Sequence, residues 1–260
     1  MYDLQKANMW KRMSAALFDC ILLAIVVLGF ALLLTTVLGF DGYMEQKNAL
    51  DAKYMAEYGL DPDLTMEELN AFTDAEKESY QAAVNAANEA IRQDPELSRV
   101  LGMLLSLAML ITTFSILGGY LLLEFLVPLW LKNGQTLGKK IFGVAVMRVD
   151  GVRLSPMLLF ARTVLGKYTV GTMVPVFAVI LMVFGRMGFL GVVLVGGLTL
   201  IQAILFFGSQ NHTPIHDKLA QTVAVDMASQ MIFDSPEALL AYKKRIHAES
   251  VANAAAPQDK

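Results

Sequence analysis

The stretch that decides the fold is WKRMSAALFDCILLAIVVLGFALLLTTVLG, residues 10–39. From Met13 to Gly39 it contains one acidic residue, Asp19, and no basic residue. At about 1.5 Å per helical residue, a helix of this length exceeds the roughly 30 Å hydrocarbon core of a bilayer. The stretch is therefore predicted to cross a membrane.

Asp19 is the unusual residue of this first span. An aspartate in the middle of a membrane helix costs roughly 2.5–3.5 kcal/mol on insertion scales, so it usually faces a neighbouring helix or a water-filled cavity. Arg12 lies seven residues earlier, which is about two helical turns and places both side chains on one face. We expect Arg12 at the level of the lipid head groups and Asp19 below it.

The composition of the 260 residues also indicates a membrane protein. Hydrophobic residues make up 55% of the chain and charged residues 17%, which is too apolar for an ordinary soluble domain. The single cysteine, Cys20, excludes an intramolecular disulfide and a CxxC metal site. We expect no cofactor, metal or nucleic-acid partner, and no enzyme activity, because no nucleophile has a histidine partner in a recognisable arrangement.

The charged residues divide the chain into segments of opposite sign. Residues 41–99 carry 14 acidic and 5 basic residues, with capping boxes at 65–68 and 73–76 that predict helices. Residues 132–167 carry seven basic residues and one acidic residue.

The predicted order is an N-terminus and first span (1–39), an acidic helical external insert (40–99), a second span (100–131), a basic cytoplasmic hairpin with an interfacial helix (132–167), a third and a fourth span (168–208) and a cytoplasmic C-terminal segment (209–260).

The orientation follows from the positive-inside rule. The basic segment 132–167 and the Lys11-Arg12 pair are predicted to be cytoplasmic, which places the acidic insert outside. We expect a multi-pass protein of a bacterial cell (inner) membrane, surrounded by the lipid bilayer, with both termini in the cytoplasm.

A β-hairpin signal sets the number of spans. Residues 144–149 alternate in polarity and are followed by the turn Asp150-Gly151. A two-stranded hairpin needs another strand or a surface to pack on, and residues 222–225 can supply that strand. The chain then returns to the cytoplasm, so residues 168–208 must form two spans, with Arg186 in the turn between them. The predicted fold is an all-α polytopic membrane protein with four transmembrane helices and a small cytoplasmic β-hairpin.

Three polar residues are predicted to lie in one layer of the membrane. In the four-span arrangement, Asp19, Glu124 and Gln202 each lie about 9–10 Å inside the cytoplasmic boundary, and Tyr120 is one turn from Glu124. Two carboxylates at one depth share a proton, hold a cation or pair with arginine. These four residues are the candidate ion or proton site.

A structural role for the same acids is the alternative. Asp19 and Glu124 can each fasten helices together through Arg12, Arg162 or Lys167. Asp217 is expected to pin the cytoplasmic hairpin to Arg162 rather than to take part in transport. We assign Arg12, Arg162, Asp217 and Lys139 a structural or charge-tuning role.

The sequence resembles the RDD family of integral membrane proteins, which is named for one arginine and two aspartates. Arg12 and Asp19 match the signature of the first span, residues 134–151 match the glycine-rich cytoplasmic stretch, Arg162 matches the arginine that follows it, and Asp217 matches the last aspartate. The similarity covers residues 10–39 and 100–226 and leaves out the acidic insert. The resemblance implies little about function, although a cation/proton antiport is ascribed to some members.

Two functions are therefore open. The first is a small monovalent cation/proton transporter that uses Asp19 and Glu124, and four spans would then require a homo-oligomer. The second is a membrane accessory or assembly subunit that binds a partner membrane protein through the insert 41–99.

Overall fold

The computed structural model describes residues 4–132, 134–208 and 214–255. The chain forms two compact units. One unit comprises Met1–Phe30 and Thr113–Lys260, and the other comprises Ala31–Thr112. Helices α1 (Met9–Leu38) and α5 (Pro95–Gly119) contribute residues to both units.

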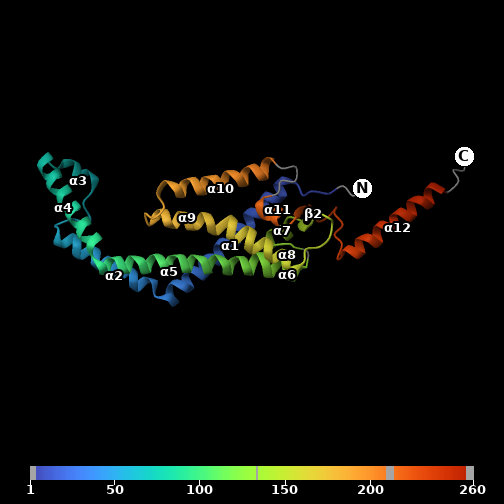
Figure 1. Cartoon of the computed structure of the whole chain (residues 1–260), viewed down its shortest axis with the longest axis horizontal. Coiled ribbons are helices and arrows are strands. Elements are labelled where there is room, and N and C mark those ends of the chain that lie inside the picture. Colours follow the sequence, from blue (N-terminus) through green and yellow to red (C-terminus); the bar gives the residue numbers. More distant parts are fainter. Residues whose placement is uncertain (1–3, 133, 209–213, 256–260) are drawn as a thin grey trace. The chain divides into compact units, whose positions relative to one another are not determined.

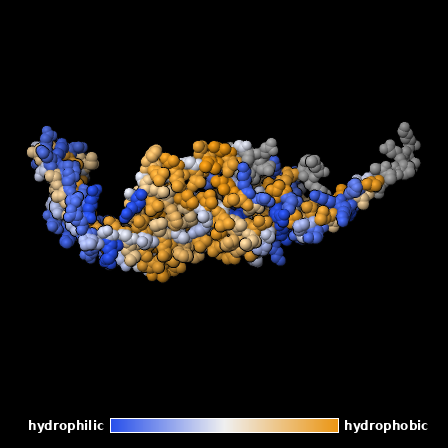
Figure 2. All heavy atoms as spheres, viewed as in Figure 1, coloured by the Kyte–Doolittle hydropathy of each residue, from blue (hydrophilic) through white to orange (hydrophobic). Residues whose placement is uncertain are grey.

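Four helices in the described part of the chain are long and apolar enough to cross a membrane. They are α1, the run Pro95–Leu131, the run Pro156–Val183, and α10 (Gly188–Gly208). Pro95–Leu131 consists of α5, the π-helix η1 (Tyr120–Leu126) and α6 (Val127–Leu131), and Pro156–Val183 consists of α8 (Pro156–Phe160), the π-helix η2 (Ala161–Met173) and α9 (Val174–Val183). Apolar side chains cover α9 and α10 on the face seen in Figure 2. The predicted all-α membrane fold with four spans is confirmed.

Each π-helix ends two residues before a proline. Pro128 follows η1 and Pro175 follows η2. A proline inside a helix has no N–H to donate and its ring crowds the carbonyl four residues earlier, which favours local widening of the helix. Four residues before Pro128 is Glu124, whose carbonyl accepts a hydrogen bond of 3.0 Å from the Thr163 hydroxyl.

The expected interfacial helix and the third span are continuous. Helical residues run without a break from Pro156 to Val183, so the expected boundary between an interfacial helix and a span at residue 167 lies inside one continuous helix. Helix α9 then lies side by side with α10 (Figure 1), joined by a turn in which Gly185 and Gly188 have positive φ and Arg186 is exposed.

A small sheet gathers residues that flank the four membrane helices in the described part of the chain. Strand β1 (Val144–Arg148) pairs antiparallel with β2 (Thr222–Asp226) in the register Val146 to Ala224. The predicted pairing with residues 222–225 is confirmed, whereas the local hairpin after β1 is reduced to one bridge, Met147 to Arg153. Lys6, before α1, forms a bridge to Val225 on the other side of the sheet. Short helices α7 (Leu137–Ile141) and α11 (Ile215–Leu219) precede β1 and β2, and α12 (Pro236–Ala255) ends the described chain.

The acidic insert is helical, as predicted. It contains α2 (Phe40–Glu57), α3 (Met66–Ala71) and α4 (Asp74–Gln93). Both predicted capping boxes are present, on α3 at Thr65 and on α4 at Thr73. The Tyr54 hydroxyl of α2 donates a 2.6 Å hydrogen bond to Asp94, which also caps the start of α5. The insert therefore folds through its own contacts.

Candidate functional site

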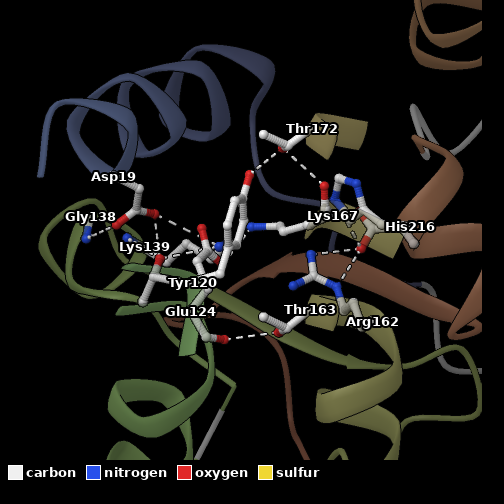
Figure 3. A network of polar contacts seen from close by, with 12 residues as sticks. Asp19, Tyr120, Glu124, Gly138, Lys139, Arg162, Thr163, Lys167, Thr172 and His216 are labelled. Atoms are coloured by element: carbon white, nitrogen blue, oxygen red, sulfur yellow. Dashed lines mark hydrogen bonds and ion pairs between the residues drawn. The ribbon is translucent and has the colours of Figure 1, made fainter. Parts of the chain in front are cut away.

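The polar residues singled out in the sequence line one cavity of about 320 Å³. Its wall comes from α1, η1, η2, α7, α10 and α11, all within the larger unit. The four candidate ion-site residues are among the lining residues, and so are the four residues assigned to charge tuning: Arg12, Asp19, Tyr120, Glu124, Lys139, Arg162, Gln202 and Asp217. Figure 3 shows how most of these side chains point toward one another.

Asp19 fastens α1 to α7. One carboxylate oxygen accepts a 2.8 Å hydrogen bond from the backbone N–H of Gly138, and the other accepts a hydrogen bond from the Thr136 hydroxyl. Lys139 Nζ lies 3.8 Å from the same carboxylate. A Cβ at Gly138 would overlap the Ala15 carbonyl and the Asp19 carboxylate. Close approach of α7 to Asp19 therefore requires glycine at this position.

Glu124 joins η1 to η2. Its carboxylate accepts a 2.5 Å hydrogen bond and ion pair from Lys167 Nζ, and the two side chains are 9% and 15% exposed. The Thr163 hydroxyl binds the backbone carbonyl of Glu124 from the same π-helix that carries Lys167. One turn away, the hydroxyls of Tyr120 and Thr172 are hydrogen-bonded at 2.8 Å. Three side-chain contacts therefore connect η1 to η2 at the level of the cavity.

Asp217 joins α11 to η2, as the sequence analysis predicted. Both Nε and an Nη of Arg162 lie 2.7 Å from one carboxylate oxygen, and the Thr222 hydroxyl donates to the same oxygen at 2.9 Å. Burial opposes ionisation of Asp217, but the Arg162 guanidinium outweighs it and holds the pKa of that carboxyl well below its usual range. The pair is therefore charged, with both side chains 4% exposed.

Two neighbouring groups have shifted pKa values outside the membrane spans. Burial lowers the pKa of His216 to about 3, so this imidazole is neutral at pH 7. Burial, followed by the positive charge of Lys167, lowers the pKa of Lys139 to about 8. Lys139 therefore keeps its proton at pH 7 and loses it in mildly alkaline solution.

The described lining of the cavity contains both basic and acidic side chains. Its described lining includes four basic side chains, Arg12, Lys139, Arg162 and Lys167, and three carboxylates. His216, which also lines the cavity, is neutral and does not add to this count. Asp19 and Asp217 each lie beside a basic side chain and also accept hydrogen bonds from hydroxyl or backbone donors. Glu124 is paired with Lys167, whose Nζ lies 2.5 Å from the carboxylate.

Sequence reasoning assigned no role to Thr136 and Gly138. A signal for both exists, because a threonine placed just before a short helical segment is a typical N-cap, and its hydroxyl and the following N–H groups are free to bind a carboxylate. What the sequence lacked was the information that Asp19, more than a hundred residues away, faces this cap.

Comparison with known proteins identifies one family. The family model for the RDD family matches residues 6–221. No curated protein and no solved structure matches the chain.

Proposed function

We propose that this chain, which belongs to the RDD family, transports a small ion across a bacterial cell membrane through the cavity lined by Asp19 and Glu124. The observation that carries the proposal is the set of three ion pairs, Asp19 with Lys139, Glu124 with Lys167, and Asp217 with Arg162, around a single cavity in the membrane helices. Charged side chains at membrane depth are costly, and they commonly mark ion pathways. Ion pairs that only fasten helices together do not require a cavity beside them.

The sidedness of the proposal follows from the sheet. Residues before α1, between the second and third spans, and after the fourth span meet in one sheet, so they lie on the same side of the membrane. The excess of basic residues in 132–167 favours the cytoplasmic side. Both termini would then be cytoplasmic and the acidic insert external.

The specific form expected within the family is exchange of a monovalent cation for a proton. In this form a cation takes the place of a lysine ammonium beside Asp19 or Glu124. The test of this exchange uses everted vesicles from a strain without its own antiporters. The vesicles are loaded with a fluorescent reporter of the proton gradient. Sodium, lithium and potassium gluconate form the cation series, and choline salts of chloride, acetate and phosphate form the anion series.

Transport through the cavity is supported if added ions dissipate the proton gradient in wild-type vesicles but not in Glu124→Gln vesicles with the same amount of protein. Lys140→Gln is the matched control, because Lys140 is exposed and is not part of the cavity wall. No response to any cation or anion by well-expressed wild type would overturn the proposal.

A second candidate function rests on the acidic insert. Helices α2, α3 and α4 fold through their own caps and the Tyr54–Asp94 bond, yet ion transport does not need them. An accessory role through a basic partner protein at this surface predicts that replacing residues 43–94 by a short linker abolishes partner capture and leaves ion flux unchanged. Loss of flux with no loss of a captured partner would count against this role.

A further inference from the structure

We infer that Pro175 is a positioning residue for the cavity: it keeps η2 in the π-helical register, and this register aligns Lys167 with Glu124. Lys167 and Glu124 line the cavity of the proposed ion transport, so the role of Pro175 in transport rests on that proposed function. Pro175 itself is not among the residues that line the described part of the cavity. It therefore acts on the site only through the helix that carries it.

The residues of η2 that line the cavity follow the spacing of a π-helix. They are Arg162, Lys167, Gly171 and Thr172, and three of them are five residues apart. A π-helix forms hydrogen bonds between residues five apart, so residues at this spacing lie about one turn from each other. The Thr172 hydroxyl has the same spacing, since it donates a 3.0 Å hydrogen bond to the Lys167 carbonyl. Figure 3 shows Arg162, Lys167 and Thr172 around one group of polar side chains.

An α-helical register would separate these side chains. At 3.6 residues per turn, each residue of an α-helix is rotated by about 100° from the one before it. Arg162 is a fixed reference because Asp217 holds it, and Lys167 would be rotated away from it by about 140°. Lys167 would then lie near the opposite face of the helix and could not keep its 2.5 Å contact with Glu124. The ion pair between η1 and η2 therefore depends on the π register.

A π-helix of this length needs a local cause. π-Helices are rare and occur mostly as single turns inside α-helices, whereas η2 comprises 13 residues, Ala161–Met173. Pro175 supplies a cause because it has no N–H and its ring crowds the carbonyl four residues earlier, that of Gly171. The N–H of Val174, directly before the proline, bonds to the carbonyl of Thr169, five residues back. The π bonding therefore continues up to the residue that precedes Pro175.

Two threonines of η2 report the register. Thr172 lines the cavity, whereas Thr169 is exposed and is not among the residues that line its described part. Each hydroxyl donates to the carbonyl five residues earlier, so replacing either threonine by cysteine removes a bond of the same kind. An α-helical register would exchange their places. Thr169, seven residues after Arg162, would be rotated by only about 20° from it, and Thr172 by about 80°.

The experiment compares the labelling rates of Thr169→Cys and Thr172→Cys with a small water-soluble thiosulfonate. The full chain is held in lipid nanodiscs and carries Cys20→Ala, because Cys20 also lines the cavity. A thiol that faces lipid stays protonated and unreactive, so position 172 should be labelled at least about tenfold faster than position 169. Pro175→Ala restores the missing N–H, and the ratio of the two rates should fall to one or below.

Pro156→Ala is the matched control. Pro156 lies in the same continuous helix but at its first residue, where the missing N–H is harmless, so this variant should keep the ratio. In everted vesicles with the same amount of protein, Pro175→Ala should lose ion-dependent dissipation of the proton gradient as Glu124→Gln does. If Pro175→Ala folds poorly, Pro175→Val restores the same N–H with a side chain closer to proline in size.

Four results would overturn the inference. They are a ratio of one or less in the chain that keeps Pro175, no labelling at either position, an unchanged ratio in a folded Pro175 variant, and unchanged flux in a variant whose ratio has fallen. If the chain with Pro175 carries no ion, the proposed function fails, while the two labelling rates still test whether Pro175 sets the register of η2.

Discussion

The buried pair between Arg162 and Asp217 offers the sharpest test of the structure. Asp217→Asn removes the negative charge but keeps a side chain of nearly the same size. The variant leaves the Arg162 guanidinium, 4% exposed, without its carboxylate. It also replaces the oxygen that accepts from Thr222 by a neutral amide.

The expected loss of stability is large because both partners are buried. Breaking a buried ion pair by removing one partner typically costs about 3–5 kcal/mol, since the other charge stays buried and uncompensated. The full range applies here because solvent hardly screens side chains with 4% exposure. A cycle with Arg162→Met and the double variant should give a coupling energy of at least about 2 kcal/mol.

Unfolding in mixed micelles at increasing fractions of sodium dodecyl sulfate, followed by tryptophan fluorescence, measures these free energies. The control is Glu249→Gln, which breaks an ion pair to Arg245 with side chains 59% and 66% exposed and should match wild type. The reasoning is refuted if Asp217→Asn unfolds at the same detergent fraction as this control.

The pH dependence of this pair has a definite sign. Arg162 depresses the pKa of Asp217 below its ordinary value of 3.8. A depressed carboxyl pKa adds stability that is fully present above the unfolded value and is lost as the pH falls through the folded value. The stability difference between wild type and Asp217→Asn should therefore stay constant from pH 8 to about 4 and shrink only in stronger acid.

Three further predictions concern single contacts. Gly138→Ala should sharply reduce the abundance of folded protein in membranes because a Cβ there overlaps α1. Gly102→Ala, at an open position, should not reduce it. Equal abundance of the two variants would contradict the close approach of α7 to α1. The hydrogen bond to Asp94 raises the pKa of Tyr54 to about 12, so Asp94→Asn should bring it back toward 10, as measured by ultraviolet absorbance of tyrosinate against a Tyr54→Phe reference. After reductive ¹³C-methylation, NMR should show a lysine signal that titrates near pH 8 and is missing from the Lys139→Arg variant. If wild type shows no such signal, Lys139 is not buried as the structure has it.

Local rules were sufficient for much of the architecture. The run 10–39 contains enough apolar residues to cross a bilayer whatever its neighbours do. The capping boxes at Thr65 and Thr73 join residues three apart, so their hydrogen bonds are present as predicted. The pairing of residues 222–225 with the alternating stretch 144–149 was also predicted, because a hairpin needs another strand or a surface, and the structure pairs 222–226 with 144–148.

The start of the third membrane helix shows where local rules fall short. Residues 154–167 include Arg162 and Lys167, which is why the sequence predicts an interfacial helix that leads into the third span. In the structure these charges are compensated by Asp217 and Glu124, so the helix continues from Pro156 to Val183. Charge lowers hydropathy in the sequence, but a paired charge can remain inside a membrane protein.

The sequence by itself determined which segments are long and apolar enough to cross a membrane and which segments are capped, because hydropathy and helix caps act over a few neighbouring residues. Only the tertiary structure decided the partners: Asp19 binds the cap of α7, and Glu124 binds Lys167. Partner choice depends on how each helix rotates and how closely two backbones approach, as at Gly138. That basic and acidic side chains from distant parts of the chain line one cavity could be known only after those helices had brought them together.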